Sequence, residues 1–379
     1  MIIKNARNLP AKLLMSAWPS DAPFLSVILK ATFALEPSQM PARPAPQQLP
    51  ILEADVPLHP DATDGLVRFE ADCVPFKPRT DIVLVGDACT PKGRPARTLD
   101  VEIRVGATSK ILRVFGERRW SLVAGQKAPL LVGPADFARM PLTYERAFGG
   151  IDRQASVGEL SPGSRPWYAK NPYGQGYIAA RTVKAIHDRP LANIEDPAHP
   201  VRSWDTCPPP AGCGFYPRGN EARMRFAGTY DPKWKAERAP APPQDFSFDF
   251  YNGAHPDLQT PSYLVGNEPV QLKHVDPDAP LIAFSLPGWS PKLRVKQGKT
   301  PAATGTGTPL PDEVPFRLDT LVFIPAERCF YQVWRARLPV QTPSLLEVTS
   351  LSIDYDLLPP GQNPPPAPPH RGYPTPIRT

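Results

Sequence analysis

The segment PLTYERAFGGID places a tyrosine, a glutamate and an arginine side by side, shortly before two glycines. Tyr144, Glu145 and Arg146 are residue types that enzymes use for acid–base chemistry and for binding anions. Gly149 and Gly150 allow the backbone to come close to another group. The segment is therefore a candidate active site, a candidate docking surface or a rigid structural turn.

A pair of carboxylates on facing walls of a cleft would allow glycoside hydrolysis. The aromatic-rich middle of the chain supplies four candidates, Glu145, Glu195, Asp196 and Asp231. They lie beside Asn, Pro and Arg, and carboxylates in such loops commonly accept turn or salt-bridge hydrogen bonds. The pattern favours structural roles for these side chains and leaves hydrolysis of glycans or peptides as an alternative.

Motifs for other chemistries are missing from the sequence. It contains no G-x-S-x-G nucleophile elbow, no histidine pair with zinc-site spacing and no Lys-Ser/Thr ending to a glycine-rich loop. Its five cysteines are an odd number and scattered, which favours reduced thiols in a reducing compartment. We therefore predict a protein that is not an enzyme, with no catalytic residue, no metal and no cofactor.

The elements that would position these residues read mostly as strands. Residues 98–106, TLDVEIRVG, alternate apolar and polar side chains, the period of a half-buried strand. We expect them to form a meander with residues 79–88 and 110–120, through tight turns near Gly93 and Gly106. Further strands are predicted at 24–35, 280–289, 316–325, 328–338 and 344–358.

Proline is the outlier in composition, with 54 of 379 residues, about three times the usual ~5%. Proline breaks helix interiors and cannot donate to a sheet ladder, so short strands joined by rigid loops are expected. We predict a mainly β protein in which strands from both ends of the chain form β-sandwich-like sheets. The middle of the chain is predicted to be long, loop-rich and aromatic-rich.

Residues 1–358 are predicted to form a single large β-rich domain. The sequence leaves open a division into two sub-domains, about 1–135 and 276–358, bridged by the loop-rich residues 136–275. Residues 359–379, PPGQNPPPAPPHRGYPTPIRT, cannot pack a core and are predicted to be a proline-rich disordered tail.

The net charge of +6, from 43 basic and 37 acidic residues, is a mild excess spread along the chain. Nucleic-acid binders usually concentrate positive charge in a stripe or a tail. No apolar stretch approaches the length of a membrane span, and the N-terminus lacks a signal-peptide core. We predict a cytoplasmic protein that binds neither nucleic acid nor membranes; its oligomeric state does not follow from the sequence.

Eight motifs occur in order along the chain: FKPRTDIVLVGDA, GERRW, MPLTYERAFGGID, NPYGQGY, LANIEDP, AGTYDPKW, PQDFSFDFYNGAHPDLQ and LPGW. Taken together, they resemble the bacterial domain-of-unknown-function family 2169 (DUF2169). The resemblance covers about residues 20–290 and continues more weakly through the C-terminal strands.

This resemblance implies a role in the type VI secretion system of a Gram-negative bacterium. Members are encoded beside effector, spike-protein and PAAR-tip genes and are regarded as cytoplasmic adaptors or chaperones. The resemblance thus implies a non-enzymatic protein that binds a cognate toxic effector and promotes its loading onto the VgrG spike and its PAAR tip. A glycan or peptide hydrolase and a structural component of the secretion particle are the alternatives.

In PLTYERAFGGID we expect the Tyr-Glu-Arg triplet to knit loops together through charge-assisted bonds, and Phe-Gly-Gly to form a turn. Part of this surface is expected to face the effector or the spike, because Tyr, Trp and Arg dominate binding hot spots. The candidate structural and partner-binding residues are Tyr144, Glu145, Arg146, Phe148, Gly149, Gly150, Trp167, Asn171, Tyr177, Asn193, Glu195, Asp196, Tyr230, Asp231, Trp234, Phe250 and Asn252.

Overall fold

The chain is mainly β, as predicted. The computed structural model describes residues 3–5, 7–17, 23–37, 40–60, 65–122, 128–153, 155, 166–179, 186–297, 311–339 and 348–358. Within these ranges the strands form two five-stranded sheets, one four-stranded sheet and four two-stranded pairs. The predicted tail, residues 359–379, lies outside the described residues, and the division into sub-domains stays a prediction.

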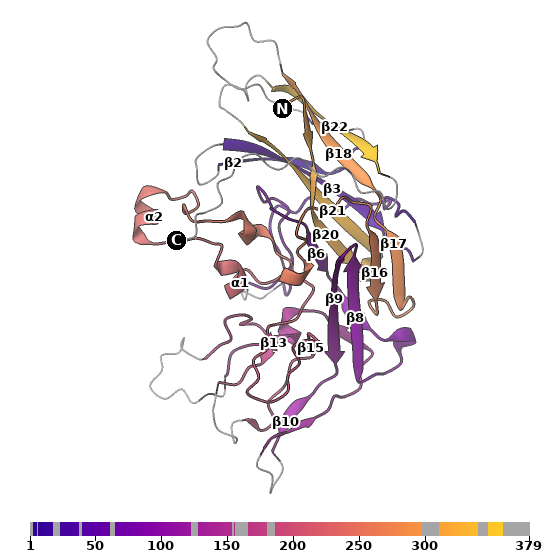
Figure 1. Cartoon of the computed structure of the whole chain (residues 1–379), viewed down its shortest axis with the longest axis vertical. Helices are drawn as coiled ribbons and strands as arrows, with labels where there is room; N and C mark the ends of the chain where they lie inside the picture. Colours follow the sequence, from indigo (N-terminus) through magenta and orange to yellow (C-terminus); the bar gives the residue numbers. More distant parts are fainter. Residues whose placement is uncertain are drawn as a thin grey trace.

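The central sheet joins strands from both ends of the chain (Figure 1). Its longest strands pair antiparallel, and the short strand at one edge runs parallel to its neighbour. The strand of residues 23–34 is buried along nearly its whole length, because both faces of the sheet are covered. The strand order is β2 (Ala11–Ala17), β3 (Pro23–Ala34), β21 (Cys329–Pro339), β20 (Arg317–Ile324) and β6 (Asp81–Leu84).

The second five-stranded sheet contains the predicted alternating strand. Val101 and Ile103 are buried while Arg104 is exposed, and a turn at Gly106 leads into the next strand, as predicted. The predicted three-stranded meander is wrong, because β6 is buried at every position and lies in the central sheet instead. The order is β15 (Ile194–Glu195), β9 (Thr108–Phe115), β8 (Thr98–Val105), β16 (Pro269–Lys273) and β17 (Leu281–Ser285).

The four-stranded sheet also joins the two ends of the chain. A short N-terminal strand pairs parallel with the last strand, which pairs antiparallel with the strand that begins at Trp289. The order is β1 (Ile3–Asn5), β22 (Val348–Leu357), β18 (Trp289–Gln297) and β19 (Glu313–Pro315).

The two faces of the central sheet differ in chemistry. Residues paired directly across neighbouring strands share a face. Phe33, Phe330 and Phe323 are paired in this way and form an aromatic row. Trp289 of β18 lies 4.9 Å from Phe33, and Phe284 of β17 lies 5.2 Å from Phe330, measured between ring centroids. Both other sheets therefore pack on this one face, in a sandwich-like arrangement.

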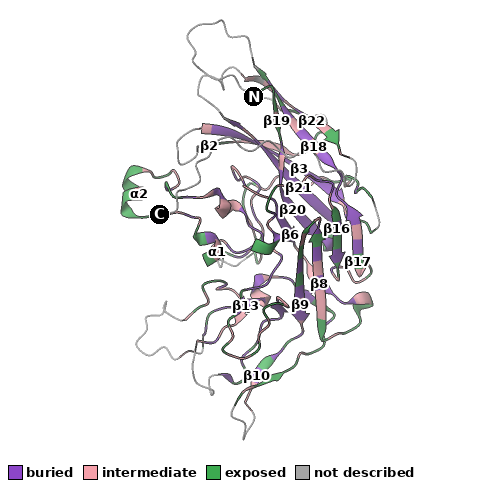
Figure 2. Cartoon of the chain, viewed as in Figure 1, coloured by how far each residue is buried: buried purple, intermediate pink, exposed green. Residues whose placement is uncertain are grey.

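The opposite face carries buried charge. Lys30, Arg335 and Asp81 lie in β3, β21 and β6 and are each at most 3% exposed. Figure 2 shows that the central strands are largely buried, whereas peripheral segments such as α2 are exposed. The charged face is covered by loops of the chain, which must supply partners for these groups.

Short elements complete the described structure. None of the helices in the described ranges is long and apolar enough to cross a membrane. The paired short strands are β4 (Val56–Pro57) with β5 (Val67–Phe69), β7 (Asp87–Cys89) with β12 (Arg139–Pro141), β10 (Arg119–Ser121) with β11 (Leu130–Val132), and β13 (Phe148–Gly149) with β14 (Gln175–Gly176). The helices are α1 (Glu221–Met224) and α2 (Pro232–Glu237), with 3-10 turns η1 (Pro91–Gly93), η2 (Tyr144–Arg146), η4 (Phe248–Tyr251), η5 (Pro256–Leu258) and η6 (Pro325–Glu327).

Candidate functional site

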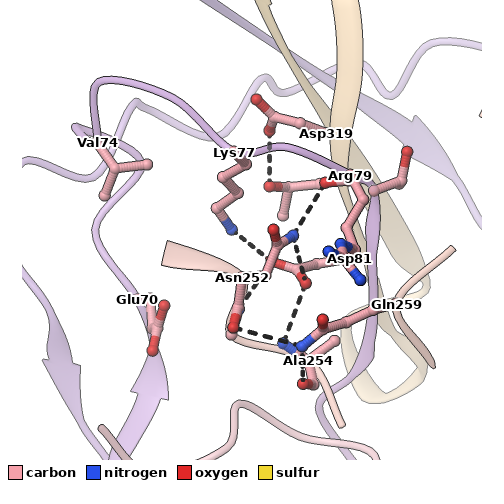
Figure 3. A network of polar contacts seen from close by, with 12 residues as sticks. Glu70, Val74, Lys77, Arg79, Asp81, Asn252, Ala254, Gln259 and Asp319 are labelled. Carbon is pink, nitrogen blue, oxygen red and sulfur yellow. Dashed lines mark hydrogen bonds and ion pairs between the residues drawn. The ribbon is translucent and has the colours of Figure 1, made fainter. Parts of the chain in front are cut away.

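Asp81 is fully buried at the start of β6 and joins two of the sequence motifs (Figure 3). Its Oδ2 accepts hydrogen bonds from Lys77 Nζ at 2.7 Å and from the backbone N–H of Gly253 at 2.9 Å. Its Oδ1 accepts from Asn252 Nδ2 at 3.0 Å and from the Ala254 N–H at 3.2 Å. One carboxylate therefore fixes the loop that follows η4 against the central sheet.

Two further cations on the charged face bind the segment of residues 70–76. Lys30 Nζ lies 2.8 Å from Asp72 Oδ2 and 4.0 Å from the centre of the Tyr331 ring. The Arg335 guanidinium pairs with Asp319 and donates to the carbonyls of Asp72 and, at 2.9 Å, Val74. These contacts hold the segment across the sheet.

Helix α1 is fixed by the same segment. Arg223 is 3% exposed and forms an ion pair with the buried Glu70. Its guanidinium also donates to the carbonyls of Tyr216 at 2.7 Å and Phe250 at 2.8 Å. The loop-rich middle of the chain is thus tied to the central sheet through a chain of buried, hydrogen-bonded ion pairs.

A loop platform, defined as residues 142–152, 166–178 and 191–196, contains most of the predicted site residues. Asn171 is fully buried, and its Nδ2 donates to the carbonyls of Tyr144 at 2.8 Å and Phe148 at 3.1 Å. Phe148-Gly149 forms the short strand β13 paired with β14, where a turn was expected. A Cβ on Gly149 would lie 2.1 Å from the Asn171 carbonyl oxygen, and one on Gly150 2.2 Å from that of Gly174. The two glycines are therefore required for this close approach of backbones.

Asn193 is the second buried amide of the platform. Its Nδ2 donates to the Phe115 carbonyl at 3.2 Å, and its Oδ1 accepts from Gln175 Nε2 at 2.6 Å and Arg146 Nη1 at 3.3 Å. Arg146 Nη1 also contacts Glu117 Oε1 at 2.8 Å. This amide joins the platform to the edge of β9.

The three residues of the Tyr-Glu-Arg triplet have different environments. Arg146 makes the charge-assisted bonds just described, and Glu145 Oε1 lies 2.9 Å from His59 Nε2 near the surface. Tyr144 is 3% exposed, and its ring lies 4.8 Å from that of Tyr216. Its hydroxyl has no hydrogen-bond partner among the described residues, so Tyr144 acts here as a core residue.

The platform also presents apolar surface. Ile151 and Trp167 face each other across an isolated β-bridge and are 44% and 53% exposed. Tyr177 belongs to the same platform, and the centre of its ring lies 5.6 Å from that of the Tyr168 ring. Glu195 is buried against Arg118 and accepts from the Val201 N–H at 3.2 Å. Two apolar side chains are therefore held exposed on a rigid base.

Three predicted residues lie instead on the excursion that contains α2, which extends from the body in Figure 1. Asp231 caps α2, accepting from the Trp234 N–H at 2.7 Å. The Trp234 indole N–H donates to the Ala241 carbonyl at 2.9 Å, and its ring lies 4.6 Å from that of Tyr230. Tyr230 is 57% exposed.

A cleft of about 430 Å³ opens between η5, α1 and the loop after β15. Lys110 reaches it from β9, with Nζ 2.6 Å from Asp257 Oδ2 and 3.5 Å from Asp196 Oδ2. The lining residues are Lys170, Asp196, His199, Pro209, Pro210, Tyr216, Glu221, Ala222, Arg225, His255, Pro256 and Asp257.

Protonation in this cleft follows from burial and from Lys110. Burial, and then the charge of Lys110, lower the pKa of His255 to about 4, so the ring is neutral near pH 7. Burial works to raise the pKa of Asp257, but the hydrogen bond and the charge of Lys110 bring it below its usual value. Asp257 is therefore ionised near pH 7, and a general acid would need the opposite shift.

The four carboxylates that suggested hydrolysis do not share one cleft. Of these four, only Asp196 lines the cleft at η5. Glu145, Glu195 and Asp231 are engaged with His59, Arg118 and the N-terminus of α2, as described above. No group of three or more His, Cys, Asp or Glu side chains in the described ranges is placed to hold a metal ion.

Sequence reasoning overlooked Lys30, Asp81, Lys110 and Arg223. One signal was present: Lys30 lies inside the apolar run FLSVILKATFAL, where a charge is buried only with a partner. Lys110 was similarly readable as the charged residue on the apolar face of its strand, with Leu112 and Val114. The partners themselves lie too far along the chain to be identified without the fold.

The comparison with known proteins identifies the family. A family described as an uncharacterized protein conserved in bacteria, DUF2169, matches residues 20–335. The chain therefore belongs to this family, and the predicted resemblance is confirmed at that level. No curated protein and no solved structure matches the chain.

The Asp81 contacts generate a prediction about stability. Asp81→Asn should lower the free energy of unfolding by about 3–5 kcal/mol, because it leaves the buried Lys77 ammonium without its counter-charge. Urea denaturation followed by tryptophan fluorescence measures the change.

Asp136→Asn is the matched control, since Asp136 pairs with Arg97 in solvent, with both side chains more than half exposed. Its cost should stay below about 1 kcal/mol. Equal costs for the two variants would contradict the anchoring role of Asp81.

The glycine contacts generate a second prediction. Gly149→Ala should destabilise the protein by roughly 1–3 kcal/mol or more, because the added Cβ overlaps the Asn171 carbonyl and the backbone has a φ of 151°. Gly219→Ala, where the nearest atom is 3.8 Å away, should change stability by at most about 0.5 kcal/mol. Thermal melts compare the two, and an unchanged Gly149→Ala melting temperature would refute the steric argument.

Proposed function

We propose that this chain is a non-enzymatic adaptor, or chaperone, of the bacterial type VI secretion system. It binds a cognate toxic effector in the cytoplasm and promotes the loading of that effector onto the VgrG spike and its PAAR tip. The family membership supports the bacterial setting. The partner and the secretion role come from the resemblance and are proposals.

The observation that carries the binding role is the exposed pair Ile151–Trp167. Both side chains are about half exposed, yet the backbone beneath them is fixed by Asn171 and the two glycines. A rigid apolar pair loses little conformational entropy when a partner covers it, and tryptophan is among the residues most enriched in binding hot spots. This pair therefore suits binding without turnover.

The structure also directs which residues to test. Tyr144 is a core residue, so its replacement would report on folding instead of binding. Trp234 is half-buried and bonded within its own loop. Trp167 can be replaced without opening a buried cavity, which makes it the residue of choice.

A co-purification experiment tests the proposal. The tagged full chain, co-expressed with the neighbouring effector and spike protein, should recover the effector. Trp167→Ala should weaken effector binding by about 2 kcal/mol or more, roughly 30-fold, if the side chain is a hot spot.

Leu281→Ala is the matched control, because Leu281 is 56% exposed but lies in β17, at the opposite edge of its sheet from the platform strand β15. It should recover the effector as the unaltered chain does, with an unchanged melting temperature. Recovery of neither effector nor spike by the folded, unaltered chain would refute the adaptor function.

A further inference from the structure

We propose that one edge of the central sheet pairs with the same edge of a second copy of this chain. The edge is strand β2, Ala11–Ala17, which reads AKLLMSA. It pairs on one side with β3 and is the last strand in the order of its sheet (Figure 1). The inference goes beyond the adaptor function and does not depend on it.

The backbone of β2 is open on its outer side. In an antiparallel pair, alternate residues bond to the neighbouring strand, and the others point their N–H and C=O groups away from it. The Lys30 N–H donates to the Pro10 carbonyl at 3.0 Å and continues the register between β2 and β3, so the even-numbered residues of β2 bond to β3. Ala11, Leu13 and Met15 therefore point their backbone groups outward, where no described residue bonds to them.

The neighbouring part of the same sheet edge is covered by the chain itself. Beyond the end of β2, the Thr32 carbonyl accepts from the Ala45 N–H at 2.9 Å, and the Thr32 N–H donates to Gln48 Oε1 at 2.8 Å. Edge strands are usually protected by proline, a bulge or several charges. The register of β2 with β3 runs without a shift, and its one charge, Lys12, is paired with Glu53. Strand β2 is therefore a template for pairing with another strand.

The order of residue types in β2 fits a second copy of the same strand. Two copies related by a two-fold axis at Leu14 pair antiparallel, and each Leu14 then opposes the other. Leu13 opposes Met15 on both sides of the axis, so apolar residues face apolar residues. Lys12 opposes Ser16, which keeps the two lysines apart. The match between the strand and its own reverse favours a second copy over an unrelated strand.

Neighbouring registers fit less well than the axis at Leu14. An axis at Leu13 would oppose Leu14 to Lys12, and an axis at Met15 would oppose Leu14 to Ser16. The axis at Leu14 also opposes the outward-pointing residues to one another, as the hydrogen bonds require. Met15 is 50% exposed and both leucines are half-buried, so pairing covers apolar surface. A contact of one strand pair is a small interface, and we expect an equilibrium between monomer and dimer.

Sedimentation velocity of the full chain tests the pairing. Over a series of concentrations across the micromolar range, the unaltered chain should shift from monomer to dimer. Met15→Pro should abolish the dimer, because it removes an outward N–H and places a ring against the second copy while the hydrogen bonds from β2 to β3 remain. Met15→Lys should weaken dimerisation by roughly tenfold or more, because it opposes a charge to Leu13 of the other copy. The lysine variant keeps the test decisive if the proline variant loosens the strand.

Met40→Lys is the matched control, because Met40 is 66% exposed but lies outside the strands. It makes the same change of side chain and should dimerise as the unaltered chain does. Melting temperatures recorded at concentrations where the unaltered chain is monomeric should agree for Met15→Lys, Met40→Lys and the unaltered chain. Loss of the dimer is then not loss of the fold.

Intermolecular disulfide formation tests the register. The background carries Cys73→Ser and Cys207→Ser, which remove the two thiols that are not buried. On mild oxidation Leu14→Cys should give a covalent dimer on a non-reducing gel, because the Cα atoms of this opposed pair would lie about 4.5 Å apart. Ser16→Cys should give far less, because its two copies would lie four residues apart along the strands, about 13 Å.

Several outcomes would overturn the proposal. These are a monomer at every concentration, a dimer that persists unchanged in both Met15 variants, and equal crosslinking of Leu14→Cys and Ser16→Cys. A chain that stays monomeric alone but loses the effector with Met15→Pro would also overturn it, since the edge would then pair with a strand of the effector. Trp167→Ala tests the adaptor function on the loop platform, so either proposal can fail without the other.

Discussion

The buried Asp81 carboxylate is the contact on which the loop-rich middle of the chain depends. A buried ion pair adds little net stability compared with an apolar replacement, but breaking it is costly because one charge remains buried alone. The four hydrogen bonds to Asp81 come from one lysine and one short loop, so the loop can occupy only one position. Glu70 and Asp72 form similar buried ion pairs, with Arg223 of α1 and Lys30 of β3.

The two faces of the central sheet stabilise the fold in different ways. The aromatic row of Phe33, Phe330 and Phe323 supplies non-directional burial, which tolerates small shifts between sheets. The charged face supplies directional hydrogen bonds and ion pairs, which do not tolerate such shifts. Loops with few strands of their own thereby gain fixed positions, and a fixed loop can present apolar side chains to a partner at low entropic cost.

The sequence predicted elements better than it predicted their connections. Alternation in β8 and the continuous apolar run of β3 follow from local periodicity, and both were readable. The sheet that contains β6 was not readable, because its partner β20 lies more than 200 residues away. The ion pairs share this difficulty: Lys30 and Asp72 are 42 residues apart, and Glu70 and Arg223 are 153 apart. Residue type alone also did not show that Tyr144 is buried and Trp167 exposed. Nor did it show which carboxylates are engaged in structural ion pairs.

An adaptor that loads an effector must also release it, which limits the kinds of contact it can use. Apolar contact at Ile151 and Trp167 would provide affinity that depends little on salt or on the identity of the client. A small apolar area of this kind would give affinity without very slow dissociation, and such binding does not require catalysis.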